Sequence, residues 1–319
     1  MSHTPALGKR PRWWTELPLI AVVYALYSAG RLLVRGEVSD AVDHGLSILH
    51  IEKVLGINLE HPLNRFFTHH ALFGIPADFA YASLHYLITP ALLIWVFKCR
   101  PANYSFLRTW LMIATLIGLV GFTLLPTSPP RLLDAAQGFT DTMAQYGSYG
   151  WWGGDASAPR GLGGLTNQYA AMPSLHVGWA LWCGVVLWRY GRGRWARIAG
   201  VVYPLGIAFV VMGTANHYLL DAVAGIAVMG VGLLLTRPAL RLAERIASRF
   251  PRISRTAAHP ASPTGSHTAS PGETPAAGAV VSGGCETSAG ERFPRQAART
   301  DVADSHGDAR ADSAATAAR

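Results

Sequence analysis

The stretch YLLDAVAGIAVMGVGLLLT, residues 218–236, decides the fold. It is 19 residues long, and its one charged side chain, Asp221, stands near its beginning. A helix of that length rises about 28 Å, close to the roughly 30 Å thickness of the hydrocarbon core of a bilayer. The stretch therefore predicts a helix that crosses a membrane.

Five other apolar runs of similar length precede it, at residues 17–34, 71–97, 106–125, 172–190 and 195–213. The chain of 319 residues is 50% hydrophobic and only 14% charged, whereas an ordinary soluble domain is about 25% charged. This composition excludes a fully solvated enzyme. The predicted fold class is all-α, a polytopic membrane protein built as a six-transmembrane helix bundle.

The ends of the chain differ from the bundle, which spans residues 17–238. Residues 1–16 form a basic segment, and the run that follows is interpreted as a retained span because no small-residue cleavage site follows it. Residues 239–255 are basic and amphipathic. Residues 256–319 contain few large apolar residues, so they cannot bury enough surface to fold and are predicted to be a disordered cytoplasmic tail.

Basic residues mark one side of the predicted bundle. The segments before the first span, after the second, after the fourth and after the sixth are basic, whereas segments 37–70 and 126–171 carry more acidic than basic residues. The positive-inside rule then places both termini in the cytoplasm and these two segments outside. This topology accounts for the net charge of +8 without nucleic acid as a partner. Only 3 of the 27 basic residues are lysine, which indicates a bacterial source and hence a bacterial cell membrane.

The outer segment between the first two spans has apolar residues at helical spacing over residues 41–58. Two interpretations stay open for it. It is either an amphipathic helix that lies in the outer membrane interface or a helical cap packed on the bundle.

Polar residues gather at the outer ends of three predicted spans, where a buried charge needs a partner or a function. They read PTSPPR at 126–131, AMPSLH at 171–176 and NHYLLD at 216–221. By the predicted topology all three groups lie on the same side of the membrane at a similar depth. We therefore expect them to converge.

His217 and Asp221 are four residues apart, so on a helix their side chains share one face. A carboxylate bound to one imidazole nitrogen fixes the tautomer and leaves the other nitrogen as a nucleophile. His176 is a second histidine, suited to protonate a leaving oxygen. Taken alone, each residue is more typical of packing or of a neutralised buried acid than of catalysis. Their convergence favours the catalytic interpretation.

The two remaining groups offer binding sites for an anion. Pro173 and Ser174 predict a helix N-terminus, whose N–H groups and positive dipole suit a phosphate, and Ser174 adds a hydroxyl donor. Arg131 follows two prolines that stiffen its approach, and its guanidinium can bind a phosphate through two parallel hydrogen bonds.

Together these motifs resemble the phosphatidic acid phosphatase type 2 superfamily, whose membrane members have six spans. The Ser-Pro-Pro, Pro-Ser-Leu-His and His-Tyr-x-x-Asp order looks most like the branch of inositol phosphorylceramide synthases, over residues 75–236. The resemblance implies that His217 is the nucleophile that forms a phosphohistidine. It also implies that Asp221 orients this histidine and that His176 is the general acid.

The sequence departs from the phosphatase branch of that superfamily at two cation positions. A lysine stands there seven residues before the arginine, where this chain has Leu124, and a Ser-Arg pair precedes the nucleophile, where this chain has Val210 and Val211. Arg131 is therefore the main visible cation, and the resemblance to the transferase-like branch is strengthened. That resemblance implies an alcohol acceptor such as inositol.

Other polar residues lie close to these motifs. Asp78 and His85 are seven residues apart in one predicted span and either support the site or bridge helices. Asn167 and Gln168 precede the fourth span and either bind a headgroup or cap a turn. No metal-ligand spacing and no nucleotide-binding motif is visible, so the predicted chemistry uses neither a metal nor a cofactor.

The first functional hypothesis is therefore an enzyme that transfers a phosphoryl or phosphodiester group of a lipid at the outer leaflet. Water as the acceptor makes it a phosphatase, and another alcohol makes it a phosphotransferase. A transporter or lipid scramblase that uses the intramembrane His and Asp is the alternative. A non-catalytic scaffold is the third hypothesis, and it requires no convergence of His176, His217 and Asp221.

The predicted topology can be tested by cysteine labelling. Single cysteines near Gly147 and Asn216 should react with an impermeant thiol reagent added from outside, whereas one near Arg192 should not. Reaction at Arg192 alone would reverse the topology and place the motifs in the cytoplasm.

Overall fold

A computed structural model describes residues 38–152 and 168–249, together with residues 14, 16–22, 25 and 29. These residues are mostly helical, and no strand occurs among them. The longer helices are α2 (Val38–Leu55), α3 (Glu60–His69), α4 (Ala71–Cys99), α5 (Pro101–Leu124), α7 (Leu175–Tyr190), α8 (Gly193–Gly213) and α9 (Leu219–Arg249). The predicted all-α class is confirmed over the described ranges.

Four of these helices, α4, α5, α8 and α9, are long and apolar enough to cross a membrane. They contain four of the six predicted spans. The span predicted at 172–190 appears as α7, which begins only at Leu175. Its 16 residues are fewer than the roughly 20 that a helix needs to cross a bilayer. Most of the run at 17–34 lies outside the described residues, as do residues 1–13 and 250–319.

Two predicted boundaries change in the structure. The last span and the basic segment after it form one helix, because α9 continues through Pro238 to Arg249. The outer segment contains α2, which agrees in part with a helical cap packed on the bundle and in part with an amphipathic helix in the membrane interface. Its Ala41 and Leu49 are buried, whereas Val54 and Leu55 are 71% and 61% exposed.

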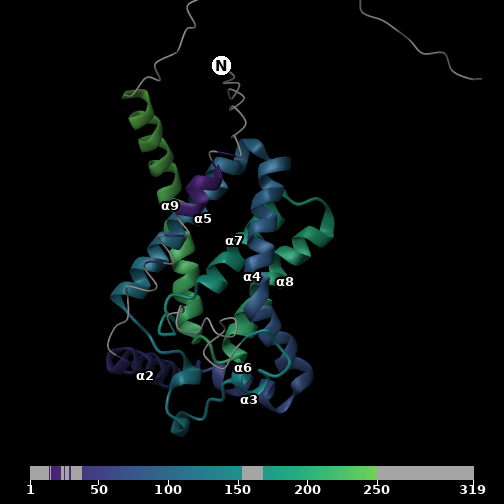
Figure 1. Cartoon of the computed structure of the whole chain (residues 1–319), viewed down its shortest axis with the longest axis vertical. Helices are drawn as coiled ribbons and strands as arrows, with labels where there is room; N and C mark the ends of the chain where they lie inside the picture. Colours follow the sequence, from purple (N-terminus) through teal and green to yellow (C-terminus); the bar gives the residue numbers. More distant parts are fainter. Residues whose placement is uncertain are drawn as a thin grey trace, which may run out of the picture. The chain divides into compact units, whose positions relative to one another are not determined.

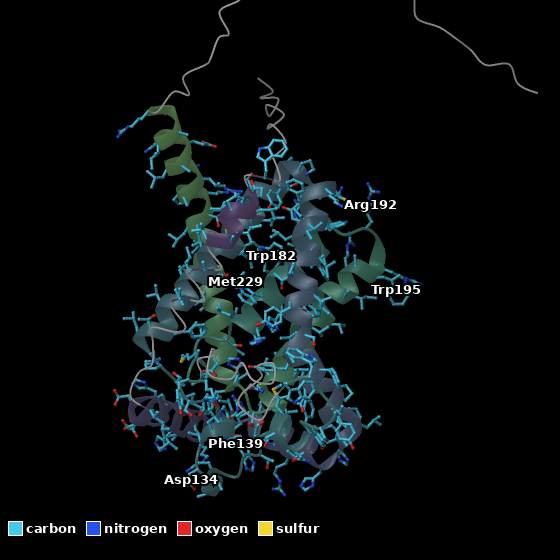
Figure 2. All side chains as sticks on the ribbon, in the orientation of Figure 1. Asp134, Phe139, Trp182, Arg192, Trp195 and Met229 are labelled. Carbon is cyan, nitrogen blue, oxygen red and sulfur yellow. The ribbon has the colours of Figure 1, made fainter. Side chains whose placement is uncertain are left out.

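The helices α2, α3 and the short α6 (Thr142–Gln145) gather at one end of the helical bundle (Figure 1). Asp134 and Phe139 lie at this end, and Arg192, in the turn between α7 and α8, lies toward the opposite end (Figure 2). Asp134 of one acidic connecting segment and Arg192 of one basic connecting segment thus lie apart in the bundle.

Aromatic side chains fill the middle of the bundle between α5, α7 and α9. The Trp182 Nε1–H donates to the Leu107 carbonyl at 3.1 Å, and the Trp110 Nε1–H donates to the Met229 carbonyl at 2.8 Å. All four residues are buried, and Trp182 and Met229 are labelled within the bundle in Figure 2. A buried indole requires an acceptor for its N–H, so these bonds fix the helix positions as well as the packing.

Glycines allow α7 and α9 to cross closely beside their N-terminal ends. A Cβ on Gly225 of α9 would stand 2.2 Å from the Ser174 carbonyl oxygen, and one on Gly178 of α7 would stand 3.3 Å from the Gly225 carbonyl oxygen. Any side chain at Gly225 would therefore push apart the starts of both helices. This contact sets the distance between the two predicted histidine motifs.

Substitution of Gly225 by alanine should destabilise the bundle by about 1–3 kcal/mol, because the added methyl group meets backbone atoms that cannot move aside. Gly230→Ala is the matched control in the same helix, since nothing lies within 4 Å of its Cβ. The free energy of unfolding in mixed detergent micelles measures both effects. Equal stability of the two variants would contradict the close crossing.

Candidate active site

The polar centre of the site is the N-terminal end of α9. His217 lies two residues before the helix begins, so the pair is not formed along a helix face as predicted. Instead, Asp221 turns back from the first turn and its Oδ2 lies 3.3 Å from Nδ1 of His217. The same oxygen accepts the Tyr218 N–H at 3.0 Å. Asp221 thus caps its own helix and binds the histidine with one carboxylate oxygen.

Both side chains of this pair are buried. His217 is 4% exposed and Asp221 is fully buried. With a proton on Nδ1, His217 donates to the carboxylate, and its Nε2 then carries the lone pair. The arrangement therefore provides an oriented imidazole with one basic nitrogen directed away from the acid.

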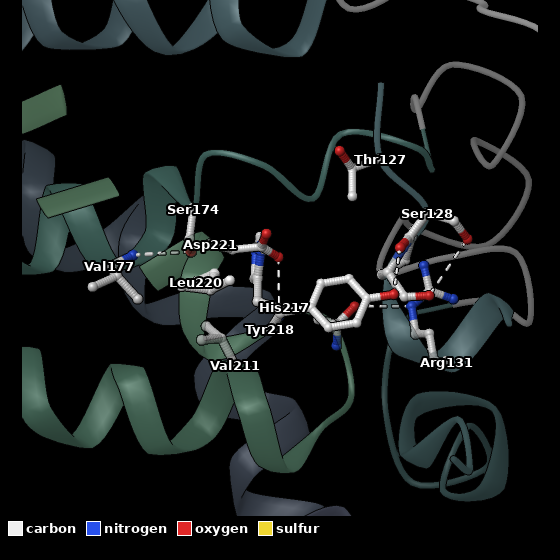
Figure 3. Close-up of polar contacts among 12 residues, drawn as sticks. Thr127, Ser128, Arg131, Ser174, Val177, Val211, His217, Tyr218, Leu220 and Asp221 are labelled. Carbon is white, nitrogen blue, oxygen red and sulfur yellow. Dashed lines mark hydrogen bonds and ion pairs between the residues drawn. The ribbon is translucent and has the colours of Figure 1, made fainter. Parts of the chain in front are cut away.

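The loop after α5 is tied to the start of α9 and to the segment before α7. The Tyr218 hydroxyl donates to the Ser128 carbonyl at 2.9 Å (Figure 3). The Thr127 N–H donates to the Tyr169 carbonyl at 2.7 Å. Thr127 and Ala170 form an isolated parallel bridge. Through these bonds the three predicted polar groups come together at one end of the bundle.

Ser174 is the N-cap of α7. Its hydroxyl oxygen accepts the Val177 N–H at 3.5 Å, and its own backbone N–H donates to the Asp221 carbonyl at 2.9 Å (Figure 3). The predicted helix N-terminus is therefore present, directly beside the first turn of α9. Ser174 is fully buried, so the structure uses its oxygen for capping.

The two histidines lie within one aromatic cluster. The ring centroids of His176 and His217 are 5.7 Å apart. Tyr81 of α4 stacks on the His176 ring at 4.5 Å, and His85 of α4 meets the same ring edge-on at 4.5 Å. His85 is thus in contact with a predicted site residue, and its supporting role stays a prediction. Tyr81 was not predicted, because a tyrosine in an apolar run has no distinguishing pattern.

Arg131 reaches the site from the loop after α5. Its Nε–H donates to the Asn216 side-chain oxygen at 2.9 Å, and its Nη1–H donates to Asp141 at 2.9 Å. Its backbone N–H also donates to the carbonyl of Ala215, a residue with a positive φ of 53°. Arg131 is thus tied to the two residues that directly precede His217, and Asp141 offsets part of its charge. Figure 3 shows Arg131 and His217 in one view.

The remaining predicted residues lie at different distances from this centre. Asp78 is fully buried and accepts the Thr142 hydroxyl at 2.7 Å, so it connects α4 to α6. This is the helix-bridging interpretation. Gln168 is half-buried in the turn before Ala170, and Asn167 lies outside the described residues.

No group of three or more His, Cys, Asp and Glu side chains that could hold a metal ion occurs within the described part of the chain.

Comparison with known protein families supplies the decisive observation. The sequence model of the PAP2 superfamily matches residues 46–235, which include every helix that carries the site. The chain belongs to the PAP2 superfamily. The match begins before the range expected from the motifs and takes in most of α2. Comparisons with curated proteins and with solved structures returned no significant match.

Membership of the PAP2 superfamily fits a membrane lipid phosphatase, and the apolar helices fit a membrane protein. The His217–Asp221 pair and His176 lie within the matched range. The structure adds partners that the motifs did not predict: Asp141, Asn216, Tyr218 and a buried glutamate pair, Glu52 and Glu60. A signal existed for Glu52, which interrupts the apolar face of α2.

Asn216 is only 3% exposed, so the position near Gly147 is the one at which thiol labelling tests the topology.

The Arg131–Asp141 pair predicts how strongly the site binds phosphate. Arg131→Ala should weaken the binding of inorganic phosphate at least about tenfold, since a charge-assisted hydrogen bond to phosphate is lost. Asp141→Asn should strengthen it, because the amide keeps an acceptor for Arg131 and removes the competing charge. Titration calorimetry on the purified protein measures both constants. Unchanged binding in both variants would exclude Arg131 from the phosphate site.

Proposed function

We propose that this PAP2 superfamily protein transfers the phosphoryl or phosphodiester group of a membrane lipid through a phosphohistidine on His217. The observation that supports this most directly is the buried His217–Asp221 pair with His176 beside it. The superfamily match makes a lipid phosphate in the membrane the natural substrate class.

In the first step Nε2 of His217 attacks phosphorus, and the bond from phosphorus to the lipid alcohol oxygen breaks. Asp221 stabilises the positive charge that develops on the imidazole, because its carboxylate lies 3.3 Å from Nδ1. His176 donates a proton to the leaving oxygen. Arg131 and the N–H groups at the start of α7 bind the non-bridging phosphate oxygens.

In the second step an acceptor oxygen attacks phosphorus and the bond to Nε2 breaks. His176, now neutral, takes the proton of the acceptor, which returns both histidines to their first state. Water as the acceptor gives a phosphatase. The Ser-Pro-Pro and Pro-Ser-Leu-His motifs and the missing cations at Leu124 and Val211 support the transferase-like branch, in which the acceptor is an alcohol such as inositol.

The proposed setting is a six-span bundle in the cell membrane with both termini in the cytoplasm. The span at 17–34 and the short α7 supply the two crossings beyond the four long helices. Asp134, in the acidic connecting segment that also carries Arg131, lies at one end, and the basic turn at Arg192 lies toward the other (Figure 2). The positive-inside rule then directs the end with Asp134 outward. The substrate is then a lipid of the outer leaflet.

The alternative function, a transporter or scramblase, is not favoured by the superfamily match. Three ionisable groups of the site gather at one end of the bundle, His217, Asp221 and Arg131. A proton path across the membrane would require such groups along its length.

The roles of the two histidines predict different defects. His217→Ala should abolish the covalent phospho-enzyme and turnover, because no other group replaces the nucleophile. His176→Ala should strongly slow the turnover of lipid phosphates but only slightly slow that of activated aryl phosphates, since the aryl leaving groups need no proton. Asp221→Asn should lower kcat by about 10²–10⁴. Release of phosphate and acid-labile radiolabel on the protein measure these effects.

Near-wild-type turnover of His217→Ala on every lipid phosphate tested would exclude the two-histidine mechanism and restore the transporter hypothesis. Parallel reactions with and without inositol separate a phosphatase from a phosphotransferase. The mechanism uses no metal, so a chelator in the same assay should leave the rate unchanged.

A further inference from the structure

The first turn of α9 is also held from outside the helix, by a glutamate of α2. Oε1 of Glu52 accepts the Leu220 N–H at 2.6 Å, and the Glu52 side chain is fully buried. Leu220 directly precedes Asp221, whose carboxylate binds His217. Glu52 therefore binds the backbone one residue before Asp221, the acid of the proposed site.

Glu52 has a second buried acid beside it, Glu60 at the start of α3. Both side chains have no exposed surface, and Oε2 of Glu52 and both oxygens of Glu60 accept no hydrogen bond from a described donor. Burial, and after it the Glu60 carboxyl, raise the pKa of Glu52 to about 9. At neutral pH the Glu52 carboxyl therefore keeps its proton, which it can donate to the Glu60 side chain.

The groups around Glu52 explain why a proton is favourable there. Glu60 of α3 and Asp221 of α9 both act on it with negative charge, and the Tyr218 phenol lies in the same buried region. Lys53, its neighbour in α2, donates instead to Gln137 at 3.1 Å. Within the described ranges no Lys, Arg or His forms an ion pair with Glu52.

We propose that Glu52 is a positioning residue of the phosphoryl-transfer site. Its carboxyl holds the Leu220 N–H, and the proton that it shares with Glu60 keeps further negative charge away from Asp221. The proposal rests on the function proposed above, because it takes His217 as the nucleophile. When this proton is lost, the negative charges of Glu52, Glu60 and Asp221 repel one another near the first turn of α9. Asp221 then moves away from its position beside His217.

This role gives the reaction an alkaline limit. A carboxyl with a raised pKa keeps its proton below that value and loses it as the pH rises through it. For the wild-type protein kcat should therefore fall as the pH rises through about 9. Folding stability should decline over the range from the ordinary glutamate pKa of 4.5 up to about 9, where the folded chain binds more protons than the unfolded chain.

Two substitutions of Glu52 separate the hydrogen bond from the proton. Glu52→Ala removes the acceptor, so kcat on phosphatidic acid in detergent micelles should fall about 10- to 100-fold, with KM within about threefold. Glu52→Gln keeps an acceptor for Leu220, so kcat at pH 7 should stay within about threefold of wild type. Its alkaline fall in kcat should move away from pH 9, because residue 52 can no longer ionise.

The controls decide between the proposal and its assumptions. Glu244→Gln, an exposed position at the far end of α9, should match wild type throughout. Unchanged kcat in Glu52→Ala, or a Glu52→Gln profile identical to wild type, overturns the positioning role. If Glu52→Ala does not fold, the Glu52→Gln profile decides alone. His217→Ala is measured alongside, and full activity of that variant shows that the proposed function has failed instead.

Discussion

The structure depends on how one buried carboxylate caps the N-terminal end of a helix. Oδ2 of Asp221 accepts the Tyr218 N–H and lies against Nδ1 of His217, so the same oxygen starts α9 and orients the imidazole. A carboxylate in a buried place is unfavourable unless hydrogen bonds and a helix N-terminus stabilise it. The backbone is therefore not helical at His217, and the surrounding loops pack around this non-helical segment.

The rest of the site is built as support for this helix start. The Tyr218 hydroxyl binds the Ser128 carbonyl, the Ser174 N–H binds the Asp221 carbonyl, and Gly225 allows the close crossing of α7 and α9. Each bond joins segments that lie far apart in the sequence. Because most of these partners are backbone groups, the shape of the site depends on helix positions more than on the identity of individual side chains.

Helices and motifs could be predicted from the sequence because their signals are local. Apolar runs predicted α4, α5, α8 and α9. The spacing of His217 and Asp221 predicted that they meet on a helix face; they do meet, but His217 lies before the helix begins. The start of α7 could also be predicted, from Pro173 and Ser174. The continuation of α9 through Pro238 was not predicted, since contacts outside the local sequence decide it. The partners of Arg131 could not be predicted, because nothing in the sequence relates Asp141 to Asn216.

The aromatic contacts of His176 have a consequence for the size of what the site can hold. Tyr81 covers one face of its ring and His85 meets its edge, and both residues belong to α4. These contacts favour one orientation of the ring, in which its centroid lies 5.7 Å from that of His217. A helix that contributes no reacting atom to the proposed transfer thus helps to set the spacing of the two histidines, and with it the size of the group that fits between them.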